Sequence, residues 1–183
     1  GTSNVVRVPS SASLNLTTGM TLSAWIRPAA AQGGWRTILQ RQADAYFLTA
    51  SNGDPLHPSG GGTFNGGFQF VSGNTANPVN TWTHIALTYD GTILRLYVNG
   101  TQVATHPATG SIQTNTNPLW MGGNTPYGEY FQGLIDEARV YVRALIPAER
   151  RTAMSTPVTP TGQDTTPPTA PTAGIATLWK IDE

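Results

Sequence analysis

The acidic side chains around GLIDEARVYVRAL, residues 133–145, are the first candidates for chemistry. A glycosidase needs two carboxyl groups about 5 Å apart to retain configuration, or about 6.5 to 9.5 Å apart to invert it. Asp136 and Glu137 are consecutive, so a regular strand would send them to opposite faces. The other acids that precede residue 147 form no same-strand pair; they are Asp44, Asp54, Asp90 and Glu129.

The histidines and glycines add no catalytic motif. His57, His84 and His106 are far apart, none lies in a nucleophile motif, and no H-x-x-x-H pair is present for zinc. We expect His84 to be a partly buried structural residue. The sequence therefore predicts a protein that is not an enzyme, with a glycoside hydrolase built from acids on distant loops as the least favoured alternative.

Aromatic residues near turns are candidates for binding sugars, because the C–H face of a sugar ring packs well on Trp or Tyr. Two turn-rich stretches, GGWR and LWMGGNTPYGEYF, could display them on loops: Trp35, Trp120, Tyr127, Tyr130 and Phe131. For each, packing at the rim of the fold is the alternative. Trp25 and Trp82 lie inside expected strands, so we expect them to pack in the core or on a sheet.

Composition excludes several partners. The 183 residues include ten basic and ten acidic side chains, and only 11% are charged, which leaves no footprint for nucleic acid or an anionic membrane. The absence of cysteine excludes disulfides and thiolate sites. No apolar run approaches the ~20 residues of a membrane span, and no signal peptide precedes Gly1, so we expect a soluble monomer, cytosolic or already processed.

Short strands separated by turns predict an all-β fold, a sandwich or barrel. The expected strands lie within residues 5–8, 20–28, 35–41, 45–50, 66–73, 82–91, 93–106, 118–123 and 131–142. Residues 51–78 are rich in Gly and Asn, and we expect only one strand in this long, irregular excursion.

Two local patterns set register. Asn99-Gly100 predicts a two-residue type I′ turn that pairs Val98 with Thr101 and Leu96 with Val103. In residues 134–142, alternation places Asp136 on the same face as Leu134, Ala138 and Val140, where an isolated carboxylate would be costly.

The C-terminal part changes character. Pro147 with Glu149 close behind it predicts one short helix over residues 147–154, which would complete a domain over residues 1–154. Residues 155–174 contain five prolines and seven threonines, which is typical of an extended linker. Residues 175–183 could begin a next module, return to the sandwich as a strand, or be an expression remnant.

Four ordered segments resemble laminin G-like and pentraxin-like domains, which have the concanavalin A-like fold. The segments are MTLSAWIRP, WTHIALTYDGTILRLYVNGTQVAT, PLWMGGN and FQGLIDEARVYVRALIPAE. The resemblance implies an antiparallel two-sheet β-sandwich of jelly-roll type. The TTPPTAPTAG stretch resembles linkers that lead into fibronectin type III modules of secreted bacterial enzymes, which implies a secreted, multidomain parent protein.

The resemblance also implies a calcium site. In the family, the acid of the closing motif commonly binds calcium together with the N-terminal segment, which implicates Asp136, Asn4 and the carbonyl of Gly1. Family members usually have a strand that ends in Asp-Gly at this point, and this chain begins at that Gly. The alternative is that Asp136 follows a bulge at Gly133 and only accepts backbone N–H bonds.

The sequence and the resemblance together predict a noncatalytic carbohydrate-binding or accessory module of a secreted protein, with calcium as cofactor. Its partners would be a glycan and, in addition, neighbouring modules of the same parent protein. The alternative is a spacer domain that binds protein, or nothing, and holds other modules apart.

Overall fold

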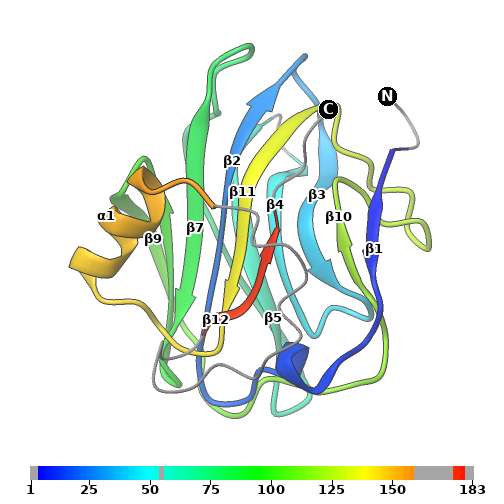
Figure 1. Cartoon of the computed structure of the whole chain (residues 1–183), viewed down its shortest axis with the longest axis vertical. Helices are drawn as coiled ribbons and strands as arrows, with labels where there is room; N and C mark the ends of the chain where they lie inside the picture. The colour runs from blue at the N-terminus through cyan, green and yellow to red at the C-terminus, as the bar shows by residue number, and fades with distance from the viewer. Residues whose placement is uncertain (1–3, 54–55, 159–174, 180–183) are drawn as a thin grey trace.

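The computed structural model describes residues 4–53 and 56–158, together with the backbone of residues 175–179. Within these residues, two six-stranded antiparallel sheets lie face to face (Figure 1). Sheet A has the strand order β1-β10-β3-β4-β5-β6, and sheet B has the order β12-β11-β2-β7-β8-β9. The prediction of an all-β jelly-roll sandwich is confirmed.

The strands of sheet A are β1 (Val6–Val8), β10 (Leu119–Met121), β3 (Gly34–Arg41), β4 (Tyr46–Gly53), β5 (Ser59–Phe64) and β6 (Gly67–Ser72). The strands of sheet B are β12 (Ile175–Trp179), β11 (Gly133–Tyr141), β2 (Met20–Pro28), β7 (Thr83–Tyr89), β8 (Ile93–Val98) and β9 (Thr101–Pro107). The helical elements are a 3₁₀ turn η1 (Ala12–Leu14) and the α-helix α1 (Pro147–Ser155).

The core lies between the sheets and follows the strand alternation. Leu22, Ala24 and Ile26 of β2 are fully buried, and alternate residues of β4, Leu48 and Ala50, face them from sheet A. Removing such side chains from water contributes about 1.5 to 3 kcal/mol for each large aliphatic residue. The other residues of the alternation lie on the outer face of each sheet.

The hairpin of β8 and β9 turns at residues 99–100, whose φ values of 48° and 79° fit the predicted type I′ turn. The predicted pair beside the turn is present. Leu96, however, pairs with Ala104 and not with Val103, so that part of the prediction was wrong. The cause is a register shift between Leu96 and Tyr97, which a turn rule does not report.

The glycine-rich region after β4 is more regular than predicted. Residues 59–72 form the β5–β6 hairpin, so the expectation of a single strand in an irregular excursion was wrong. A Cβ at Gly61 would lie 2.1 Å from the carbonyl oxygen of Gln69 and 2.6 Å from the Cα of Phe70. Glycine at this position therefore allows the backbones of β5 and β6 to approach closely. Strand propensity disfavours glycine, so the sequence was read as a loop.

The predicted short helix is confirmed as α1. Pro147 is its first residue, and the Glu149 carboxylate accepts the N–H of Ile146 at 3.0 Å while pairing with Arg143 at 2.7 Å. In the described part of the chain, no helix has the length and apolar character to cross a membrane.

The helix α1 covers part of the outer face of sheet B (Figure 1). The indole N–H of Trp25 on β2 donates to the carbonyl of Met154 at 3.1 Å. The Arg150 guanidinium lies 4.0 Å from the ring centroid of Tyr97 on β8. These contacts join the helix to the middle of sheet B.

Residues 175–179 form β12, which pairs antiparallel with β11 at the edge of sheet B. Most of the predicted linker, residues 159–174, lies outside the described residues.

Candidate functional site

A row of paired residues crosses the outer face of sheet A. Register partners on adjacent strands share a face. The pairings on β1, β10, β3, β4, β5 and β6 give, in order, Arg7, Trp120, Gln40, Phe47, Gly61 and Phe70. Their neighbours along the strands, such as Leu39 and Leu48, face the core.

A hollow of about 290 Å³, here called the aromatic hollow, lies on this outer face. Its lining residues are Trp35, Gln40, Asp44, Phe47, Thr49, Phe68, Tyr127 and Glu129. Phe68 and Tyr127 are 47% and 51% exposed, whereas Phe47 and Gln40 are buried. The buried side chains form a floor, and the exposed rings stand beside it as walls.

The aromatic rings of this face touch one another. Trp35 meets Phe47 and Phe70 edge to face, with centroids 5.7 and 5.6 Å apart, and Phe47 stacks on Phe68 at 5.6 Å and 12°. Sequence reasoning found Trp35 but missed the three phenylalanines. The alternation F-Q-F at residues 68–70 was the available signal, because it places two rings on one face of a strand.

Amide and carboxylate groups beside the rings are fixed by their own bonds. Gln40 Nε2 donates to Asp44 Oδ1 at 2.6 Å, and Asn124 Nδ2 donates to Gln40 Oε1. Glu129 Oε2 accepts the Thr37 hydroxyl at 3.2 Å. Among the described residues, Asn124 Oδ1 is a buried oxygen without a hydrogen-bond partner. The site thus combines apolar ring faces with oriented polar groups.

The loop before β11 brings Tyr127 and Glu129 to the hollow. The Asn124 carbonyl accepts the N–H groups of Tyr127 at 3.2 Å and Gly128 at 2.8 Å, which closes a turn. The Thr37 N–H on β3 donates to the Glu129 carbonyl at 3.0 Å and anchors the loop to sheet A.

Burial raises the pKa of the Glu129 carboxyl. The Thr37 hydroxyl bond lowers this pKa, and the charge of Asp44 raises it further. Burial also raises the pKa of Tyr127, to which the charges of Asp44 and Glu129 add. The hollow is therefore an environment that disfavours negative charge.

Trp120 lies on the same outer face but does not line the aromatic hollow. Its indole N–H donates to Gln42 Oε1 at 3.2 Å, and the Arg7 guanidinium lies 5.8 Å from its ring centroid. The structure therefore brings Trp35 and Tyr127 into one hollow and places Trp120 beside it.

The other two predicted aromatics lie elsewhere. Tyr130 packs over Gly123, where an added Cβ would be 2.5 Å from the Tyr130 ring. Phe131 is only 4% exposed and belongs to the core, so of the two alternatives it packs and is not displayed on a loop. It lies two residues before β11 and faces inward.

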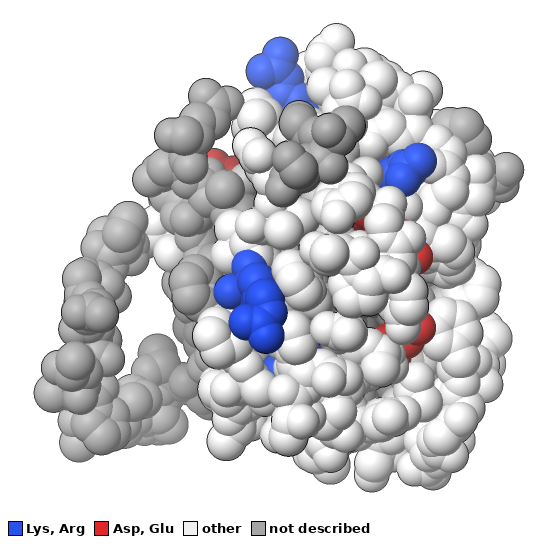
Figure 2. All heavy atoms as spheres, turned by 90° about the vertical axis from the view of Figure 1, so that its right-hand side faces the viewer, with Lys and Arg blue, Asp and Glu red and all other residues white. Residues whose placement is uncertain are grey.

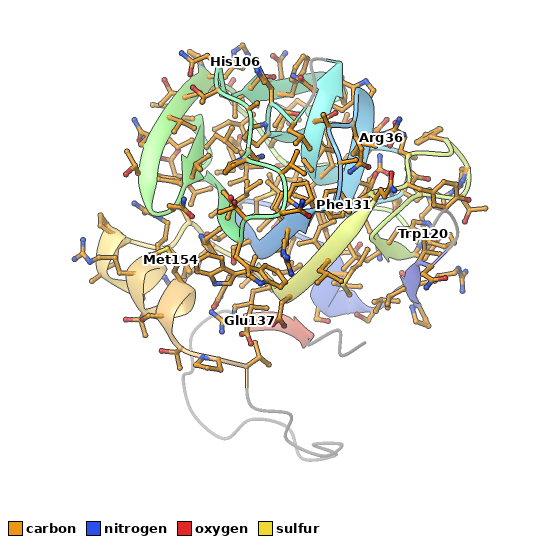
Figure 3. All side chains as sticks on the ribbon, turned by 90° about the horizontal axis from the view of Figure 1, so that it is seen from above. Arg36, His106, Trp120, Phe131, Glu137 and Met154 are labelled. Carbon is orange, nitrogen blue, oxygen red and sulfur yellow. The ribbon has the colours of Figure 1, made fainter. Side chains whose placement is uncertain are left out.

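A second hollow, of about 490 Å³, lies on the outer face of sheet B and is here called the helix-side hollow. Its lining residues are Trp25, Trp82, Asp136, Glu137, Met154, Ser155, Thr156 and Pro157. Trp82 is 40% exposed, which excludes the core and leaves the surface of sheet B as its place among the two that were expected. Figure 3 places Glu137 and Met154 on one side of the sandwich and Trp120 and Arg36 on the other.

The register of β11 explains why Asp136 lines this hollow. A bulge interrupts pairing between Asp136 and Arg139, and Glu137 has a φ of 53°. Ile135 and Ala138 therefore both face the core. The predictions that Asp136 interrupts an apolar face and that Glu137 points to the opposite face were wrong.

The carboxylates of this hollow are engaged within the chain. Glu137 Oε2 accepts from Arg139 at 2.7 Å and from the N–H of Val158 at 2.5 Å, and Arg139 also donates to the Thr156 carbonyl. Asp136 Oδ1 accepts the N–H of Glu137 at 2.8 Å. Asp136 thus accepts a backbone N–H bond, which is the alternative role that the sequence analysis left open. The bulge, however, lies at Glu137 and not at Gly133.

Asp136 and Glu137 are the acidic side chains that line the helix-side hollow. Nowhere in the described residues do three acidic or histidine side chains gather closely enough to hold a metal. Asn4 lies beside Gly122 and not in the helix-side hollow, and Gly1 falls outside the described residues. Calcium binding stays a prediction.

Among the described residues on the side seen in Figure 2, Arg, Asp and Glu side chains are scattered among uncharged ones. This agrees with the low charge content of the sequence.

The two-sheet sandwich, with β11 followed by α1, agrees with the family resemblance. A direct comparison of sequences shows whether the chain belongs to the family. A sequence model of the concanavalin A-like lectin/glucanases superfamily matches residues 1–149. The chain belongs to this superfamily. The matched residues include every side chain that lines the aromatic hollow of this superfamily member. No curated protein sequence matches the chain.

Solved structures share the superfamily fold at low sequence identity. A Bacteroides ovatus protein described as a candidate carbohydrate-binding protein is 20% identical with a TM-score of 0.74; the match covers 97% of this chain and 49% of that one. This chain thus spans about half the length of that protein.

Domain 4 of AbnA, a GH43 extracellular arabinanase of Geobacillus stearothermophilus, was solved with arabinotriose. It is 21% identical with a TM-score of 0.62, and the match covers 84% of this chain and 73% of that one. A heptameric SAP-like pentraxin of Limulus polyphemus is 13% identical with a TM-score of 0.57, over 82% and 81%.

Proposed function

We propose that the chain is a noncatalytic carbohydrate-binding module and that the aromatic hollow binds a neutral glycan. The observation that carries this proposal is the combination of exposed rings with fixed amide and carboxylate groups on one sheet face. Trp35, Phe68 and Tyr127 offer apolar surface to the C–H faces of sugars, and the carboxylates of Asp44 and Glu129 line the same hollow as acceptors for hydroxyl groups.

The acidic lining favours uncharged sugars. Asp44 and Glu129 both line the hollow, so a uronic acid placed there would meet like charge at low dielectric. Polar groups of both hollows bond within the chain, and the aromatic hollow differs in its set of rings in contact: Trp35 meets Phe47, which stacks on Phe68. We therefore assign the glycan to sheet A.

Two structural neighbours support this class of ligand. One carries the description of a candidate carbohydrate-binding protein, and the other is an arabinanase domain solved with arabinotriose. The arabinanase is described as extracellular, in agreement with the secreted location that the linker resemblance implies. We include secretion in the proposal.

Affinity gel electrophoresis in arabinan, galactan, xylan, β-glucan and polygalacturonate tests the proposal. We expect retardation in at least one neutral polysaccharide and none in polygalacturonate. Retardation in none of the five would favour the spacer alternative.

The least favoured alternative is a glycoside hydrolase with acids from distant loops, and Asp44 and Glu129 do come from distant loops into one hollow. Hydrolysis is therefore measured on the same five polysaccharides. We expect no release of reducing ends. Release that disappears in Glu129→Gln would contradict the noncatalytic assignment.

A further inference from the structure

We propose that the binding surface extends from the aromatic hollow across β3 to Trp120, so that the ligand is a linear glycan lying across the strands of sheet A. This inference rests on the proposed function and adds the shape of the ligand and a second platform for a sugar ring.

The register of sheet A places both platforms, the aromatic hollow and the Trp120 ring, on one face. Trp120 pairs with Gln40, and Gln40 pairs with Phe47, so the residue next to Trp120 in the row belongs to the floor of the hollow. No core-facing residue lies between them in this row.

Strand spacing gives the reach of the surface. Adjacent strands lie about 4.8 Å apart, so Trp120 on β10 is about 10 Å from Phe47 on β4 and about 19 Å from Phe68 on β6. One sugar ring covers one aromatic face. Contact with both platforms therefore requires several consecutive sugar units, which favours an extended chain over a monosaccharide.

The second platform is held in place before any ligand binds. Gln42 accepts the Trp120 indole N–H at 3.2 Å, and the Gln42 carbonyl accepts Asn115 Nδ2 at 3.0 Å. The exposed Arg7 side chain lies over the ring and brings N–H donors to the same place. A fixed ring loses little conformational entropy on binding, which is a property of a built subsite.

Oligosaccharides of increasing length test this inference. Isothermal titration is performed with arabinobiose, arabinotriose and arabinohexaose, and with the corresponding xylo-oligosaccharides. For the series that binds, we expect the affinity to rise at least about tenfold from two units to six, because the longer chain reaches Trp120.

Three variants assign the gain to residues. Trp120→Ala should remove the gain with length and leave the affinity for two units unchanged. Trp35→Ala should weaken binding at every length, because it removes one of the rings that line the hollow. Trp82→Ala changes an exposed tryptophan on sheet B and should have no effect on either series.

The outcomes separate the two proposals. Binding that Trp35→Ala weakens, but that is equally strong for two and six units, overturns the extended surface and leaves the function of the hollow intact. A gain with length that persists in Trp120→Ala also overturns it. No binding of either series, together with no retardation in any polysaccharide, overturns the proposed function and the inference with it.

Discussion

Trp35 packs edge to face on Phe47, with ring centroids 5.7 Å apart, across the β3–β4 pairing of sheet A. The same indole meets Phe70 of β6, two strands beyond Phe47. An outer sheet face that faces only water carries polar residues in most sandwiches. The connected rings on sheet A are therefore the feature of this molecule that indicates a ligand-binding surface.

Gly61→Ala should destabilise the fold and disturb the aromatic hollow. The new Cβ would meet the backbone of Gln69 at 2.1 Å and of Phe70 at 2.6 Å, so β6 must move. We expect a loss of about 1 to 3 kcal/mol in urea unfolding.

Gly67→Ala in the same hairpin is the matched control. Its nearest new contact would be an ordinary 3.5 Å, so we expect a change below about 1 kcal/mol. Equal stability of the Gly61 and Gly67 variants would show that the β5–β6 approach is looser than described.

Glu137→Gln should be strongly destabilising. It removes the negative partner of Arg139, a guanidinium that is only 4% exposed and pairs with Glu137 at 2.7 Å. An uncompensated buried charge costs about 3 to 5 kcal/mol, which chemical denaturation would detect.

The exposed Asp90 and Arg95 pair provides the comparison. Both side chains are about one-third exposed, so Arg95→Gln should cost less than about 1 kcal/mol. A Glu137 variant no less stable than the Arg95 variant would contradict the structural role of the buried pair.

His84 should make the fold sensitive to mild acid. Burial, and next the charge of Arg139, lower its pKa from 6.5 to about 4. The unfolded chain binds this proton first, so stability is complete above pH 6.5 and falls as pH drops toward 4, by about 3 kcal/mol. Urea midpoints measured from pH 7 to pH 4 give the slope.

His84→Gln isolates this contribution, because other groups titrate in the same range. The difference in unfolding free energy between wild type and variant should change with pH between 6.5 and 4 and be constant above 7. A difference that does not vary with pH would mean that folding does not shift the pKa of His84, which would contradict the lowered value.

Thermal melts test the calcium prediction that follows from the family resemblance. A cation bound to the folded state stabilises it, so calcium should raise the melting temperature above that in chelator, and Asp136→Ala should abolish the rise. The same melting temperature in calcium and chelator would rule out the site.

Most strand positions and the helix were predictable because period-two patterns, turns and a Pro-Glu helix start are local signals, whereas the glycine-rich β5 was missed. The aromatic hollow was only half predictable. Trp35 and Tyr127 stood out beside turns, but Phe47 and Phe68 looked like ordinary strand residues, and only the register across β4, β5 and β6 shows which face they share.

Asp136 shows the other limit of sequence reasoning. A single bulge at Glu137 reverses the faces of β11, so a strict alternation assigned Asp136 to the wrong side. Gly61 was misread for a related reason, since the need for glycine comes from the backbone of another strand.

The most direct measurement of the central claim is the affinity of wild type, Trp35→Ala and Trp82→Ala for the neutral polysaccharide that retards the protein, measured by affinity electrophoresis. Trp35 lines the aromatic hollow on sheet A, and Trp82 is the exposed tryptophan of the helix-side hollow. We predict at least about a tenfold loss for Trp35→Ala and no loss for Trp82→Ala. Unchanged affinity of a folded Trp35→Ala protein, or a loss confined to Trp82→Ala, would contradict the assignment of the glycan to the aromatic hollow.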